Sequence, residues 1–299
     1  MRQGGVMLQE ALVEFFIAPF SEFEFMRRAL VGACALAIAG APLGVFLLLR
    51  RMSLTGDAMA HAILPGAALG YLVAGLSLPA MTIGGLVAGL SVALLAGLVA
   101  RVTALREDAS LAGFYLMSLA LGVTIVSLRG SSVDLLHVLF GNVLALEDNG
   151  LTLIASVASL TLVALAIFYR ALALETLDPS FVSSVSRAGG YAQALFMGLI
   201  VLNLVAGFHA LGTLLAVGLM ILPAASARLW TADITRMTIV AIAVGLLSSW
   251  LGLLVSFSHN LPPGPVIILM AGMFHIVSML FGRAGGWLRR IHRQIHLEA

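Results

Sequence analysis

The chain has 299 residues, of which 61% are hydrophobic and 10% charged, and its mean hydropathy is +1.09. A soluble domain of this length would carry about 25% charged residues, so water is not the main solvent of this protein. A net charge of +2 argues against a nucleic-acid surface, and the single cysteine, Cys34, excludes a disulfide framework or a cysteine-rich metal site.

The chain opens with a segment (1–25) that mixes four glutamates with five phenylalanines and lacks a cleavable signal pattern, which predicts an extracytoplasmic interfacial segment. Apolar blocks of about 20 residues follow, the length at which a helix crosses a bilayer core. We therefore predict an all-α polytopic membrane bundle over 26–283 and a cytoplasmic tail over 284–299. The predicted spans are 29–49, 57–78, 80–100, 109–128, 150–169, 191–208, 211–227, 237–257 and 263–282.

Arginines mark the orientation, because all sixteen basic residues are arginine and most follow alternate blocks. With nine crossings, these groups share one side, which the positive-inside rule makes cytoplasmic, with the N-terminus outside. Arg27, Arg28 and Arg129 disagree, and eight crossings result if 191–208 and 211–227 form one broken element. The agreeing residues are Arg50, Arg51, Arg101, Arg106, Arg170, Arg187, Arg228, Arg236, Arg283, Arg289, Arg290 and Arg293.

Two connections stand out on this topology. The segment 130–149 is too short and too polar to span, so we expect a short helix resting on the outer side of the bundle. The segment 171–190 is the longest cytoplasmic connection, where Asp178-Pro179 can start a short helix and Gly189-Gly190 can end it. Such a helix could contact a soluble motor or could be an ordinary loop helix.

Glycines spaced by four residues occur within the predicted spans, as at Gly66/Gly70 and Gly85/Gly89. Small residues at this spacing allow membrane helices to approach closely, so we expect helix packing at these positions. The pattern carries no information about a substrate.

One acidic residue of the fourteen, Asp57, falls in an apolar block, and His61 follows four residues later. Positions i and i+4 share a helix face, so a carboxylate and an imidazole can converge on one cation such as zinc, manganese or iron. A carboxylate in a membrane costs about 2.5–3.5 kcal/mol, which favours a functional role. Alternatively, Asp57 caps the helix start and His61 is a hydrogen-bonded core histidine.

The other histidines give weaker signals. His137 lies three residues from Asp134 in the predicted outer segment and could receive an incoming ion, although a surface pair is the simpler interpretation. His209 and His259 lie near the outer ends of their blocks. His275 lies inside the last block, where we expect a packed, hydrogen-bonded side chain.

Motifs for catalysis are absent from the sequence. It contains no G-x-x-x-x-G-K-[ST], so it cannot bind ATP in the P-loop manner, and no H-E-x-x-H or G-x-S-x-G. We expect no enzyme activity and no permanently bound cofactor. Energy for uphill transport would come from an ion gradient or from a separate ATPase chain.

The sequence resembles the zinc/manganese permease family of ABC importers from about residue 22 to 282. The strings that carry the resemblance are RRMSLTGDAMAHAILPGAALG (50–70), SSVDLLHVLFGNVLAL (131–146), GTLLAVGLMILPAASARL (212–229) and LPPGPVIIL (261–269). The resemblance implies a homodimeric permease of the bacterial inner membrane, with two cytoplasmic ATPases and an extracytoplasmic metal-binding protein as partners. It implies that Asp57 and His61 are pathway ligands and that 171–190 docks the ATPase.

The residues alone leave other functions open. A gradient-driven secondary transporter or metal channel would act without an ATPase, although it usually needs several intramembrane acids. An ABC permease for a siderophore- or cobalamin-like ligand would need longer polar and aromatic pathway features. For the metal permease, zinc and manganese both accept this ligand pair, and we place zinc first and manganese second.

Overall fold

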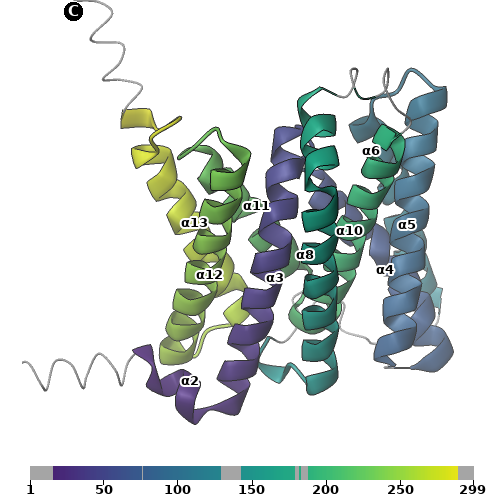
Figure 1. Cartoon of the computed structure of the whole chain (residues 1–299). Helices are drawn as coiled ribbons and strands as arrows, with labels where there is room; N and C mark the ends of the chain where they lie inside the picture. Colours follow the sequence, from purple (N-terminus) through teal and green to yellow (C-terminus); the bar gives the residue numbers. More distant parts are fainter. Residues whose placement is uncertain (1–15, 76, 129–142, 179–181, 183–187, 289–299) are drawn as a thin grey trace, which may run out of the picture.

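The computed structural model describes residues 16–75, 77–128, 143–178, 182 and 188–288, and every regular element in these ranges is helical (Figure 1). This confirms the predicted all-α fold. The elements are α2 (Ala18–Glu22), α3 (Glu24–Leu49), α4 (Thr55–Ala74), α5 (Leu78–Val102), α6 (Glu107–Leu128), η1 (Val143–Ala145), α8 (Asp148–Leu177), α10 (Ala188–Leu211), α11 (Thr213–Arg228), α12 (Ile234–His259) and α13 (Pro263–Phe281).

Each of the nine predicted apolar blocks corresponds to one helix. Eight of them are long and apolar enough to cross a membrane, and α11 is a shorter apolar helix of 16 residues. The chain reverses between α10 and α11 at Gly212, whose φ of 95° suits glycine. Gly207 of α10 lies directly against Ala216 of α11, so the two form a hairpin of separate helices.

The connection after α8, predicted over 171–190, is shorter than expected. α8 continues to Leu177, because the stretch 171–176 consists largely of good helix formers that propagate the helix. α10 begins at Ala188, so Gly189 and Gly190 lie in its first turn. The prediction that these two glycines end a helix was therefore wrong. Of the predicted outer segment 130–149, residues 130–142 lie outside the described ranges, and η1 and the start of α8 account for most of the rest.

The helices form two groups joined by α10. α3 packs against α8, α10, α11 and α12, whereas α4 packs against α5 and α6, and α10 contacts α3, α4 and α5. Figure 1 shows α12 and α13 at one edge of the bundle, α3 and α8 in the middle, and α5 and α6 at the other edge.

α4 and α5 touch through their backbones. A Cβ atom on Gly66 would overlap the carbonyl oxygen of Gly84, and one on Gly70 would overlap that of Ala80. The predicted packing role of Gly66 and Gly70 is therefore confirmed. Gly85 also serves packing, because it lies under the Ile63 side chain.

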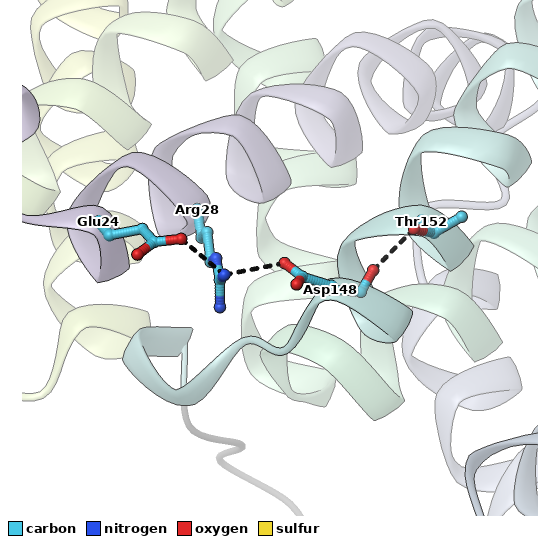
Figure 2. Close-up of polar contacts among 4 residues, drawn as sticks. All are labelled: Glu24, Arg28, Asp148 and Thr152. Atoms are coloured by element: carbon cyan, nitrogen blue, oxygen red, sulfur yellow. Dashed lines mark hydrogen bonds and ion pairs between the residues drawn. The ribbon is translucent and has the colours of Figure 1, made fainter.

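The N-terminal ends of α3 and α8 are linked by Arg28, as Figure 2 shows. Its Nη2 lies 2.7 Å from Glu24 Oε1 and 3.1 Å from Asp148 Oδ1. Thr152 Oγ1 in turn donates to the backbone oxygen of Asp148 at 2.7 Å. Exposed ion pairs contribute at most about 1 kcal/mol, so this cluster mainly positions the two helix starts.

Replacement of Gly66 by Ala is expected to destabilise the protein by about 1–3 kcal/mol, because the new methyl group meets backbone that cannot yield. The measurement is the apparent melting temperature in detergent. Gly97 of α5 is the matched control, since a Cβ there meets nothing within 4 Å. Gly97→Ala should raise stability slightly through helix propensity, and equal effects of both variants would contradict this packing.

The orientation can be tested with single cysteines on a Cys34→Ala background. Ala232 precedes α12 and Leu261 follows it, and both are exposed. A membrane-impermeant maleimide should label Leu261→Cys in intact spheroplasts, whereas Ala232→Cys should react only after permeabilisation. The reverse pattern would invert the topology.

Candidate metal site

The turn after α3 directs the chain back into the bundle. The N–H of Met52 donates to the Leu47 oxygen at 2.9 Å, and that of Arg51 donates to the Leu48 oxygen at 3.1 Å. Arg51 has a φ of 60°, so these bonds form the left-handed cap that satisfies the last carbonyls of a helix. The Met52 side chain is buried against the core, and the chain therefore stays close to α3 until α4 begins.

As a result, α4 begins inside the bundle. Gly66 of α4 meets Gly84 of α5, and from this contact α4 has eleven residues back to Thr55, whereas α5 continues for eighteen residues to Val102. At 1.5 Å per residue, α5 extends about 10 Å beyond the first residue of α4.

The contact with α11 gives the same depth. Gly56, the second residue of α4, lies against the side chains of Met220 and Ile221, halfway along α11. Asp57 is thus in the first turn of its helix, as the sequence predicted, but that turn lies well inside the ends of the neighbouring helices. Asp57 is therefore both at the start of its helix and within the depth of the bundle.

Asp57 and His61 face one another on α4. Asp57 Oδ1 lies 3.8 Å from His61 Nε2, with side-chain exposures of 64% and 31%. The His61 ring stacks on Tyr115 of α6, with centroids 6.4 Å apart and planes 26° apart. Two ligands of one tetrahedral or octahedral ion lie about 3.0–3.4 Å apart, so a small side-chain shift would bring both onto one cation.

The contacts of Asp57 and His61 can be compared with the alternative interpretation, in which Asp57 caps the start of its helix. The N-cap of α4 is Leu54, which offers no side-chain hydrogen bond. In the part of the chain that the structure describes, the Asp57 carboxylate faces His61 and accepts no hydrogen bond from the α4 amides. Its charge still favours the positive end of the helix dipole. His61 Nδ1 is buried without a hydrogen-bond partner, so His61 is not a hydrogen-bonded core histidine.

The candidate site consists of two side chains, Asp57 and His61. Among the described residues, no group of three or more His, Cys, Asp or Glu side chains is arranged to hold a metal ion. The pair lies on a stripe of α4 that continues through Leu64 and Ala68 and that the described helices do not fully cover.

Two further histidines with described side chains, His259 and His275, lie on other helices. His275 of α13 is partly buried with its Nδ1 3.3 Å from Ser226 Oγ, which confirms the predicted packed, hydrogen-bonded side chain. His259 is exposed at the end of α12, and its Nδ1 lies 2.9 Å from Ser258 Oγ. His137 and the side chain of His209 lie outside what the structure describes.

A polar cluster surrounds Arg50 and was not predicted from the sequence. Arg50 was used there only to predict the orientation of the chain. Arg50 Nε donates to Thr176 Oγ1 at 3.0 Å, and Nη1 donates to Gln193 Oε1. Burial lowers the pKa of the Arg50 guanidinium, and the carboxylates of Glu175 and Glu107 oppose this shift. No motif indicated the cluster, because Glu175 was predicted to lie in a loop, whereas it lies in the last turn of α8.

A bundle of apolar spans with a recessed carboxylate–imidazole pair defines a multi-pass membrane protein of the transport class. Residues 22–282 match the ABC 3 transport family, and the chain belongs to this family.

The chain matches two relatives with transport names over nearly their full length. The chain is 31% identical over 287 residues to the manganese import system permease protein ScaB of Streptococcus gordonii, covering 93% of this chain and 99% of ScaB. It is 29% identical over 283 residues to a "probable iron transport system membrane protein" of Haemophilus influenzae, covering 93% and 97%.

A solved structure agrees in fold. A chain of PsaBC from Streptococcus pneumoniae in complex with Fab matches with a TM-score of 0.80 and 31% identity, covering 92% of this chain and 98% of that chain. The protein is thus the membrane permease subunit of a metal ABC transporter, and not a catalytic chain.

Proposed function

We propose that this chain imports a divalent first-row metal ion, with manganese placed before zinc, and that Asp57 and His61 bind the ion during its passage. The observation that carries the proposal is the recessed pair on α4, with Asp57 Oδ1 and His61 Nε2 3.8 Å apart. Carboxylate and imidazole accept either metal. The order differs from the sequence-based preference for zinc because relatives are named for manganese and iron.

We infer that the working form is a homodimer. An aspartate facing lipid would cost about 2.5–3.5 kcal/mol, so the exposed side of Asp57 calls for a protein or water surface opposite it. A two-fold axis beside the α4 stripe would bring two Asp57–His61 pairs together. The four ligands would then surround one ion, whereas a single protomer supplies only two.

A separate cytoplasmic ATPase would drive the transport, and an extracytoplasmic binding protein would deliver the ion. Family membership supports the ATPase and leaves the gradient-driven transporter without support. Within 171–190, the connection between α8 and α10 is the proposed docking segment. The siderophore- or cobalamin-like ligand is disfavoured, because no relative named above carries such a description.

The chemistry requires weak, reversible binding. The Asp57 charge attracts a cation that has lost part of its water shell, and the His61 ring, held by Tyr115, offers Nε2 on the same side. Each protomer supplies only two of the four ligands, so a separation of the two α4 stripes would open the site, whereas a structural metal site keeps its ligand set closed. This suits a pathway from which the ion must leave.

Asp57→Asn should reduce Mn²⁺ accumulation to background, because an amide is neutral and a poor metal ligand. ATPase copurification should be unchanged, since the Asp57 side chain is exposed within the protomer. Asp108→Asn is the matched control, because it removes the same charge from an exposed residue whose ion pair with Arg106 spans 3.3 Å. Undiminished uptake by Asp57→Asn would refute the site.

Metal preference can be measured by competition in cells that express the complete transporter. Excess Mn²⁺ is expected to suppress labelled Zn²⁺ uptake more strongly than excess Zn²⁺ suppresses labelled Mn²⁺ uptake. The opposite ranking would restore zinc to first place. Uptake that persists in cells lacking the ATPase would contradict the ABC mechanism itself.

A further inference from the structure

Arg50 joins the cytoplasmic ends of four helices. It is the residue that follows α3, its Nε donates to Thr176 of α8, and its Nη1 donates to Gln193 of α10. Gln193 Nε2 donates in turn to Glu107 Oε2 of α6 at 3.3 Å. The guanidinium also lies over the Phe196 ring, 4.6 Å from its centre. A rigid fork with several donors is suited to holding such separate partners.

The cluster contains two buried polar atoms of opposite charge that lack partners. These are Arg50 Nη2 and Glu175 Oε2. Glu175 directly precedes Thr176, which accepts a hydrogen bond from Arg50. The Arg50 guanidinium and the Glu175 carboxylate nevertheless do not form an ion pair in this conformation. A buried charged atom without a partner is costly, so an arrangement that joins them would recover free energy. The cluster therefore has a second pairing available to it.

Arg50 also lies between the connection of α8 with α10 and the metal-binding pair. Thr176 and Gln193 stand on the two helices that flank this connection. On the other side, Arg50 leads into the capped turn that ends in α4, where the Thr55 N–H donates to the Met52 oxygen at 3.0 Å. Asp57 follows in the first turn of α4. A displacement of either flanking helix thus reaches Asp57 through a short, hydrogen-bonded path.

We propose that Arg50 is a positioning residue that couples movement of α8 and α10 to the first turn of α4, and that Glu175 is its alternative partner during the transport cycle. This inference rests on the proposed function, since it assumes that an ATPase moves these helices. The physical basis is that Arg50 has two sets of partners, Thr176 with Gln193 or Glu175. Both the connection between α8 and α10 and the Asp57–His61 pair would shift the balance between these two arrangements.

The test is the amount of Mn²⁺ transported per ATP hydrolysed by the permease and its copurified ATPase in proteoliposomes. Arg50→Lys keeps the charge but loses the fork, and is expected to lower this ratio about fivefold or more, with assembly intact. Glu175→Gln should lower it in the same direction. The double variant should fall no further than the stronger single variant, because both changes disable one element.

Arg51→Lys is the matched control, because the neighbouring arginine is exposed, and it should keep the wild-type ratio. The proposal is overturned if Arg50→Lys and Glu175→Gln keep the wild-type ratio, or if they lose ATPase binding and transport in parallel. If Arg50→Lys is not recovered from membranes, an unchanged ratio for Glu175→Gln alone overturns it. A wild-type complex that moves no Mn²⁺ with ATP would instead refute the proposed function.

Discussion

The backbone contact between α4 and α5 at Gly66 and Gly84 determines where the polar pair lies. Helices in a bilayer gain little from hydrophobic burial against one another, so close contact of small residues sets their relative height. Here that height places the first turn of α4 about 10 Å inside the end of α5. Uncharged residues thus decide the depth at which Asp57 and His61 stand.

The start of α4 and the ends of the surrounding helices form two connected polar layers. The layer at the helix ends surrounds Arg50 and is held by hydrogen bonds to Thr176 and Gln193. The layer deeper in the bundle is the Asp57–His61 pair. A capped turn of a few residues joins them, and its φ of 60° at Arg51 shows that the chain adopts an unfavourable backbone conformation to make this return.

Much of the fold could be read from the sequence, because a bilayer dictates the length and composition of each span. The nine helices, the packing glycines and the hydrogen-bonded His275 follow from such local rules. The depth of α4 and the cluster around Arg50 do not, since they depend on contacts between distant residues. Arg50 and Thr176, for example, are 126 residues apart in the chain. The end of α8 was missed because helix propensity carried it to Leu177, past the apolar block.

The recess of α4 also limits what can receive the cargo. If Asp57 binds the ion as proposed, the ion would be released about 10 Å inside the end of α5. A folded metallochaperone is too wide to reach that depth, whereas water or a small thiol or carboxylate ligand is not. The cell would therefore take up the metal as a hydrated or small-molecule-bound ion, and protein acceptors would compete for it only afterwards.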